Sequence, residues 1–139
     1  MKKLTKKAAR IMDAITEGLE RPGAHRKIDN TPGLMAVCIE VIEERGGNLH
    51  ISVAHYGEQA GDLMRDPEML FLKSAGDYYP YYFRNDYVGI EQWSVEFEHN
   101  AVGSPRVMIR PKQQADHAAF ANTWLQNIQE QQNIKGGRV

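Results

Sequence analysis

The chain has 139 residues, a net charge of -1, and apolar and charged fractions of 42% and 25%, which are ordinary for a globular protein. A net charge so close to zero argues against a protein that binds a phosphate backbone with its whole surface. Cys38 is the only cysteine, so an intrachain disulfide is excluded and a reducing compartment is favoured. No stretch is long and apolar enough to span a bilayer. We therefore expect one cytoplasmic domain, residues 1–139, with Cys38 as a small buried hydrophobe.

An N-terminal helical segment, residues 1–23, is the first predicted element. Apolar residues recur at three- and four-residue steps over residues 4–19, as in an amphipathic helix, and Arg21-Pro22-Gly23 ends it. Its beginning carries five cations: Lys2, Lys3, Lys6, Lys7 and Arg10. Cations there oppose the helix dipole. They predict either a frayed first turn or a site for an acidic partner or a nucleic-acid phosphate.

Residues 24–110 predict an antiparallel sheet. Residues 24–33 read as irregular chain with room for a short edge strand, and Gly46-Gly47 marks a hairpin turn. β-Branched and aromatic residues between turn signals predict strands at residues 34–43, 49–56, 68–73, 78–83, 87–99 and 106–110. Because most connections are short, the strands form a meander of five or six members rather than parallel crossovers.

The closing element is a helix over residues 111–133, followed by a loose tail at residues 134–139. Pro111 suits the first helical position. The expected apolar stripe consists of Ala118, Ala121, Trp124, Leu125 and Ile128, and His117 is expected on the exposed side. The fold class is therefore α+β: a five- or six-stranded antiparallel meander flanked by an N-terminal and a C-terminal helix, in two layers.

The polar run from Ser52 to Met69 contains the densest group of side chains able to titrate. It is interpreted as a loop that leaves a strand at His55 and carries the candidate binding residues His55, Tyr56, Glu58, Gln59, Asp62, Arg65 and Asp66. A metal site is an alternative, with imidazole and carboxylate ligands from His55, Glu58, Asp62, Asp66 and Glu68. A third interpretation is purely structural: Arg65 pairs with Asp62 or Asp66, and His55 bonds a carboxylate or carbonyl.

Tyrosines are concentrated between residues 78 and 87. Strand alternation places Tyr79, Tyr81 and Phe83 on one face, and Tyr78 and Tyr82 on the other. One set can pack under the helices, and the other must meet solvent, a partner or a ligand, so Tyr78 and Tyr82 join the candidate binding residues. A phosphate-binding glycine loop, a nucleophile elbow and a paired-cysteine motif are all missing. No cofactor and no catalytic residue are expected.

The central segment resembles an uncharacterised bacterial domain-of-unknown-function family of phages, plasmids and other mobile elements. The resemblance is carried by Ser52-Val53-Ala54-His55-Tyr56, Glu58-Gln59 and Gly61-Asp62-Leu63-Met64-Arg65-Asp66-Pro67-Glu68-Met69. It continues more loosely through Tyr79-Pro80, Asp86-Tyr87-Val88-Gly89-Ile90 and Phe120-Ala121-Asn122-Thr123-Trp124, and so spans residues 34–128. It implies one intact domain and a mobile-element origin, and it assigns no activity.

These observations favour a small, non-enzymatic protein that binds or modulates another macromolecule. The expected partner is another protein, and an acidic surface of this kind suits a basic one. Two alternatives stay open: a metal-binding protein or metal-assisted hydrolase that uses the His55 segment, and nucleic-acid binding through the basic N-terminal helix. No membrane partner is expected, and the sequence leaves the oligomeric state open.

Overall fold

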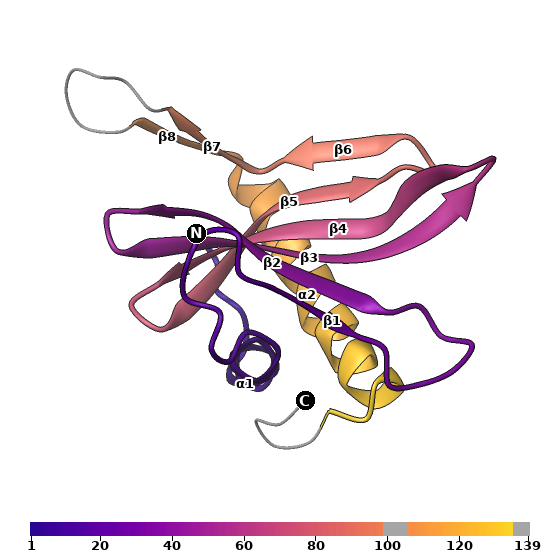
Figure 1. Cartoon of the computed structure of the whole chain (residues 1–139). Coiled ribbons are helices and arrows are strands. Elements are labelled where there is room, and N and C mark those ends of the chain that lie inside the picture. The colour runs from indigo at the N-terminus through magenta and orange to yellow at the C-terminus, as the bar shows by residue number, and fades with distance from the viewer. Residues whose placement is uncertain (99–105, 135–139) are drawn as a thin grey trace.

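The computed structural model describes residues 1–98 and 106–134. Two helices flank a six-stranded antiparallel meander (Figure 1), so the predicted α+β fold class is confirmed. In chain order the elements are α1 (Lys6–Ile15), β1 (His25–Ile28), β2 (Val37–Arg45), β3 (Asn48–Gln59), β4 (Asp62–Ser74), β5 (Asp77–Asn85), β6 (Ile90–Trp93), β7 (Val95–Glu98), β8 (Arg106–Ile109) and α2 (Pro111–Gln131). Of the tail expected at residues 134–139, Ile134 is buried in the core, and residues 135–139 lie outside the described residues.

The large sheet has the strand order β1-β2-β3-β4-β5-β6, with every neighbouring pair antiparallel. Three of its hairpins turn through two residues that both have positive φ: Gly46-Gly47, Ala60-Gly61 and Ala75-Gly76. Paired positive φ values are the mark of the type I′ turn, whose twist matches that of the flanking strands. These turns join long strands into a strongly twisted meander.

Both helices pack on one face of this sheet, with α1 and α2 on the same side of the strands (Figure 1). The shared core includes Ile11 and Ile15 of α1, Val53 and Phe71 of the sheet, and Leu125 of α2. Burying one such aliphatic side chain contributes about 1.5–3 kcal/mol. No helix in the described part of the chain is long and apolar enough to cross a membrane.

Polar contacts fix where the helices begin and end. Thr5 caps α1, because its hydroxyl accepts from the Ala8 N–H at 3.2 Å. The Arg26 guanidinium of β1 donates to the carbonyls of Ile15 and Glu17 at the other end of α1, at 2.9 and 2.7 Å. This contact satisfies carbonyls that a helix end leaves without partners and ties α1 to the edge strand.

The second α-helix carries a buried amide side chain near each end. The Gln114 amide donates to the carbonyls of Lys2 and Pro80 at 2.8 and 3.0 Å and accepts from the Lys2 N–H at 2.6 Å. The Gln132 side chain accepts from the Asn30 N–H at 2.7 Å and donates to the Met35 carbonyl at 3.0 Å. Helix α2 therefore holds both the N-terminal segment and the β1–β2 connection in place.

The predicted long strand over residues 87–99 is wrong in two respects, because the strand begins only at Ile90 and the chain changes sheet at Ser94. Strand β6 ends the large sheet, whereas β7 pairs with β8 as a separate two-stranded sheet. The Ser94 backbone bonds both to β5, through the Tyr81 carbonyl at 2.9 Å, and to the Arg110 N–H at 2.8 Å. Ser94 is fully buried, and this small residue is the point at which the strand bends.

The prediction for the tyrosine faces is also wrong, because a bulge interrupts the alternation in β5. Leu70 lies opposite Tyr82 and Phe71 lies opposite Pro80, so Tyr81 is an extra residue. Tyr81 and Tyr82 therefore both pack in the cluster on the helix-free face. Phe83 packs with the helix-side core instead, as does Tyr78.

His117 is buried, at 4% exposed, which corrects the prediction that it faces solvent. Its Nδ1 lies 2.8 Å from the Ser94 Oγ, and its Nε2 lies 3.0 Å from the Gln92 Oε1. Burial lowers the pKa of His117 below its usual value, although the charge of Asp116 partly opposes this. Because Ser94 is fully buried, this Ser–His pair joins α2 to the sheet rather than facing a substrate.

Candidate functional site: a groove on the helix-free face

Strand register determines which side chains share the face of the sheet that the helices leave uncovered. Two cross-strand rows run over that face from β1 to β6. The first row is Lys27, Cys38, Ala54, Glu68, Arg84 and Glu91. The second row is His25, Glu40, Ser52, Leu70, Tyr82 and Trp93. Charged and hydroxyl side chains dominate the β1–β4 part of this face, and aromatic side chains gather towards β6.

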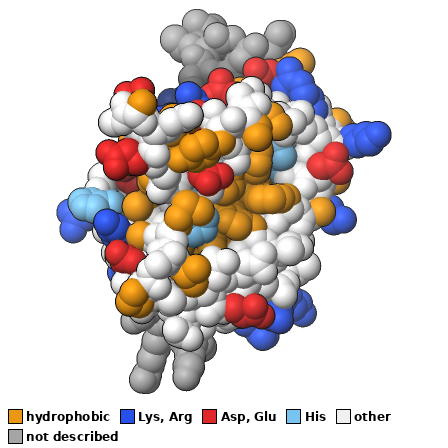
Figure 2. Space-filling model, turned by 90° about the vertical axis from the view of Figure 1, so that its right-hand side faces the viewer, with side chains coloured by type: hydrophobic (Ala, Val, Ile, Leu, Met, Phe, Trp, Pro, Cys, Tyr) orange, Lys and Arg blue, Asp and Glu red, His pale blue; other side chains and the backbone are white. Residues whose placement is uncertain are grey.

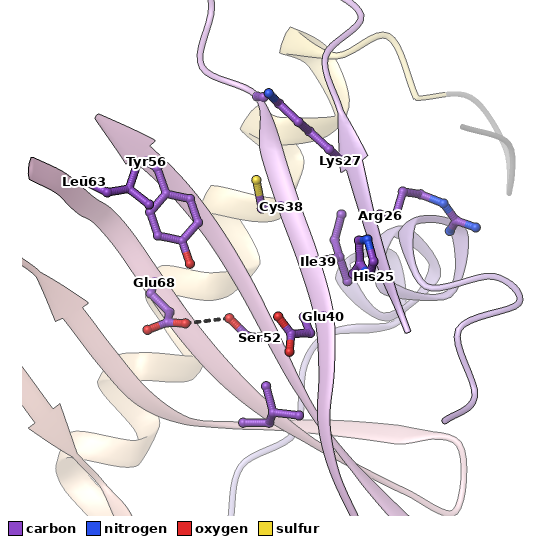
Figure 3. Close-up of a pocket in the computed structure, with 12 residues that line it drawn as sticks. His25, Arg26, Lys27, Cys38, Ile39, Glu40, Ser52, Tyr56, Leu63 and Glu68 are labelled. Carbon is purple, nitrogen blue, oxygen red and sulfur yellow. Dashed lines mark hydrogen bonds between the residues drawn. The ribbon is translucent and has the colours of Figure 1, made fainter. Parts of the chain in front are cut away.

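The β7–β8 hairpin covers only part of this face. Val95 and Phe97 pack on Leu70, Leu72 and Tyr81. The remaining part, over β1 to β4, is hollowed into a groove of about 620 Å³. Its polar lining comes from His25, Arg26 and Lys27 of β1, Cys38 and Glu40 of β2, Ser52 and Tyr56 of β3, and Glu68 of β4 (Figure 3).

Glu68 and Ser52 form the floor of the groove. The Ser52 hydroxyl donates to the Glu68 Oε2 at 2.6 Å (Figure 3), and the Glu68 Oε1 lies 3.1 Å from the Arg65 Nε. Burial is the main cause that raises the pKa of Tyr56, with a further contribution from the Glu68 charge. The Tyr56 phenol is therefore neutral at physiological pH and can donate a hydrogen bond.

A chain of ion pairs continues from Arg65 across the sheet towards β6. The Asp86 carboxylate accepts from the Arg65 N–H at 2.8 Å and from the Arg84 Nε at 2.7 Å, and the Arg84 Nη1 lies 3.3 Å from the Glu91 Oε2. The Arg65 N–H, and then the Arg84 guanidinium, hold the pKa of Asp86 below its usual value. Tyr82 donates to Glu91 at 2.5 Å, and burial and this bond raise the pKa of Tyr82 to about 12.

The polar segment after His55 is a β-hairpin and not the loop that its composition predicted. Strands β3 and β4 continue through it and pair from Tyr56–Arg65 to Gln59–Asp62. Just before that stretch Asp66 and Pro67 of β4 lie opposite the single residue His55 of β3, so the register shifts there. The polarity of the segment belongs to the end of a long hairpin that projects past its neighbours (Figure 1).

His55 does not join the acidic residues that follow it. It lies on the helix side at 5% exposed, where its Nδ1 bonds the Ala36 carbonyl at 3.0 Å and its ring lies 5.6 Å from that of Trp124. Within residues 1–98 and 106–134, no three His, Cys, Asp or Glu side chains are grouped to hold a metal ion. The proposed set of His55, Glu58, Asp62, Asp66 and Glu68 is therefore not brought together.

The other predicted binding residues fall into three places. Glu58, Gln59 and Asp62 are exposed near the hairpin turn. Arg65 pairs with Glu68 and Asp86 rather than with Asp62 or Asp66, while Asp66 accepts from the Asn85 side chain at 3.0 Å. Tyr78 is buried and donates to the Asp13 Oδ1 at 2.7 Å, and Tyr82 lies in the cluster on the helix-free face. Of the predicted set, Tyr56 lines the groove.

Most groove residues were not among the sequence candidates, including Lys27, Cys38, Glu40 and Ser52. These residues alternate along their strands with core residues. That alternation is the only signal in the sequence that places their side chains on the helix-free face of the sheet. Cys38 is half-buried in the groove rather than in the core. Burial raises the pKa of its thiol, with Lys27 opposing, so at neutral pH it is protonated and weakly nucleophilic.

The end of the molecule that carries the β3–β4 hairpin also exposes apolar side chains. Figure 2 shows hydrophobic groups gathered on this side, between acidic and basic ones. Exposed large apolar residues on the hairpin ends and connections at this end of the sheet are Leu34, Met35, Leu63, Tyr87 and Val88. Leu63, at 67% exposed, also lines the groove, so the groove opens onto an apolar rim.

Comparison with known proteins identifies one family. Its description reads Domain of unknown function (DUF6908), and it matches residues 6–134. No curated protein and no solved structure matches the chain.

Proposed function

Because the chain belongs to this family, whose description states no activity, we propose its function from the groove: it is a non-enzymatic binding protein that receives a segment of another protein. The observation that carries the proposal is a groove of about 620 Å³ on a sheet face that neither helix covers. Small-molecule binding clefts typically measure about 300–1,000 Å³, so this groove is large enough to receive side chains of a partner.

The rim of the groove favours a macromolecular partner over a small molecule. A contiguous exposed apolar surface beside polar groups marks protein interaction sites more often than isolated apolar residues do. Leu63 belongs to both the groove and the rim, so a partner seated on the rim reaches into the groove. Glu58 and Asp62, exposed at the hairpin end, add negative charge to the same surface and favour a basic partner.

Site-specific photocrosslinking tests this proposal. A photoreactive phenylalanine replaces Leu63 at the groove rim, and in a control it replaces Lys112, which is exposed at the beginning of α2. We expect a discrete adduct from position 63 alone, in cells of the native host. The adduct should also disappear in a Cys38→Trp variant, whose larger side chain fills the groove. An unchanged circular dichroism spectrum of that variant shows that it is still folded. Equal adducts from both positions, or an adduct that survives the filled groove, would refute the proposal.

A second candidate function is nucleic-acid binding through α1. Lys6, Lys7 and Arg10 of α1 are exposed and follow the three- and four-residue spacing of one helix face, and Lys3, also exposed, precedes the helix. Only Lys3 is paired within the described residues, with Asp77 at 3.6 Å. Replacing the other three with Gln should weaken binding to a duplex probe and flatten its dependence on salt. Unchanged affinity and salt dependence would exclude this route.

The remaining parts of the proposal concern location, origin and domain organisation. The single cysteine supports a cytoplasmic location. The resemblance of the segment Ser52–Met69 supports a mobile-element origin. Residues 1–139 are proposed to fold as one unit, because α2 bonds both the N-terminal segment and the β1–β2 connection.

A further inference from the structure

The chemistry of the groove suggests which group of the partner enters it; this step rests on the proposed function. Glu40, Ser52, Tyr56 and Glu68 come from three strands and converge on one end of the groove (Figure 3). The Tyr56 hydroxyl points towards the Ser52–Glu68 hydrogen bond. Both carboxylates act on Tyr56, since the charges of Glu68 and Glu40 each contribute to raising its pKa. This end of the groove is acidic and has an aromatic wall.

Its negative charge is not fully balanced within the chain. Within the described residues, no hydrogen bond or ion pair engages the Glu40 carboxylate. Arg65 lies 3.1 Å from Glu68, but its buried Nε makes no hydrogen bond of acceptable geometry. Lys27 extends away from both carboxylates towards the opposite end of the groove (Figure 3). Arg26 is held by the carbonyls at the end of α1.

We propose that this end of the groove binds an arginine side chain on an extended segment of the partner protein. A guanidinium is planar, donates five hydrogen bonds and stacks on aromatic rings. It can therefore bond Glu40 and the free lone pairs of Glu68 while it lies against the Tyr56 ring. The groove is larger than one side chain, and its apolar parts, Ile42 and Leu63, receive the residues on either side of the arginine.

Peptide display on the purified full chain tests the inference. Random twelve-residue peptides are selected on the wild-type protein, and the strongest binder is synthesised with its arginine intact, changed to Lys, and changed to Leu. We expect arginine to be enriched over the input library. The Leu peptide should bind at least about 10-fold more weakly, and the Lys peptide should fall between the two, because lysine neither stacks nor binds in a bidentate manner.

Protein variants locate the contact. Glu40→Gln should lower the affinity for the arginine peptide about 10-fold, and Tyr56→Leu should lower that affinity as well. Glu44→Gln is the matched control, because Glu44 is an exposed glutamate of the same strand outside the groove. It should leave the affinity unchanged. The bound peptide should also protect Cys38, the only cysteine, from alkylation by a maleimide in the wild-type chain.

The possible outcomes separate this inference from the proposed function. Selected peptides that need the groove but contain no excess of arginine would overturn the arginine assignment and leave the binding function standing. Equal affinity for the Arg, Lys and Leu peptides would do the same. Peptides that bind equally well to the Glu40→Gln, Tyr56→Leu and Cys38→Trp proteins, or no selection above a protein-free surface, would overturn both.

Discussion

The contact between α2 and the strand bend at Ser94 can be tested with a double-mutant cycle. His117→Phe keeps an aromatic ring beside Phe83, whose ring centroid lies 6.2 Å from that of His117, and removes both ring nitrogens. Two hydrogen bonds are lost, to Ser94 at 2.8 Å and to Gln92 at 3.0 Å. The variant therefore isolates the polar part of the contact.

The expected cost follows from burial. Each lost hydrogen bond is worth about 0.5–1.5 kcal/mol, and a buried hydroxyl left without a partner costs about 1–3 kcal/mol. Because Ser94 is fully buried, we expect His117→Phe to lower the free energy of unfolding by about 2–4 kcal/mol. Adding Ser94→Ala removes the stranded hydroxyl, so the double variant should lose less than the sum of the single variants.

Urea denaturation measures these energies, followed through the fluorescence of the two tryptophans, Trp93 and Trp124. A coupling energy above about 1 kcal/mol is expected for a buried bonded pair. Single-variant costs that add to within about 0.3 kcal/mol would show that Ser94 and His117 do not interact energetically, and the reasoning from their geometry would be refuted.

The stability difference between the wild-type protein and His117→Phe should depend on pH. Because burial lowers the pKa of folded His117, the unfolded chain takes up its proton first, near the usual pKa of about 6.5. The stability contributed by the neutral ring is complete above that pH and is lost as the pH falls through the lower pKa of the folded state. Wild type should therefore lose more stability than His117→Phe between about pH 7 and pH 5. Parallel curves of unfolding free energy against pH would contradict this assignment.

Two further predictions concern the hairpin turns and α2. Ala60→Asn should stabilise the protein by about 0.5–1 kcal/mol in the same urea assay. Ala60 has a φ of 51°, and asparagine tolerates positive φ better than alanine does. A loss of stability would contradict the turn geometry. Gln132→Ala should lower the free energy of unfolding by about 1–3 kcal/mol. It should also speed hydrogen exchange at the Asn30 amide, because that amide donates to the Gln132 side chain. Unchanged exchange at Asn30 would contradict this role of Gln132.

The elements that could be predicted from sequence are those with strong local periodicity. The stripe Ala118, Ala121, Trp124, Leu125 and Ile128 is buried as predicted, and Pro111 opens α2. The strands predicted at residues 34–43 and 49–56 are found as β2 and β3, and Ile39, Ile51 and Val53 of these strands lie in the helix-side core. Such patterns are local, and each repeats often enough to outweigh single exceptions.

The errors arose where one residue changes the pattern. Because Tyr81 is an extra residue, Phe83 lies on the face opposite to the one predicted. At Ser94 the chain leaves the large sheet and enters a second sheet. The hairpin after His55 was taken for a loop, although the tripeptide Ala60-Gly61-Asp62 repeats Ala75-Gly76-Asp77, which turns the chain between the strands predicted at residues 68–73 and 78–83. That repeat was a usable signal, whereas bulges depend on cross-strand pairing, which the local sequence does not contain.

The candidate site was harder to predict than the fold, because a face of a sheet is not a segment of the chain. Because side chains alternate between the two faces along β3, His55 packs against the helices and its neighbour Tyr56 lines the groove. The dense polar run is therefore divided between opposite faces of the sheet. Pairing then brings Glu40 beside Ser52, and Glu68 beside Ala54, although these residues belong to different strands. A groove on a meander is therefore encoded by register across strands. Substitutions that shift the register at the β3–β4 bulge should disturb the groove more than substitutions of Glu58 or Asp62, which lie at the exposed end of the same hairpin.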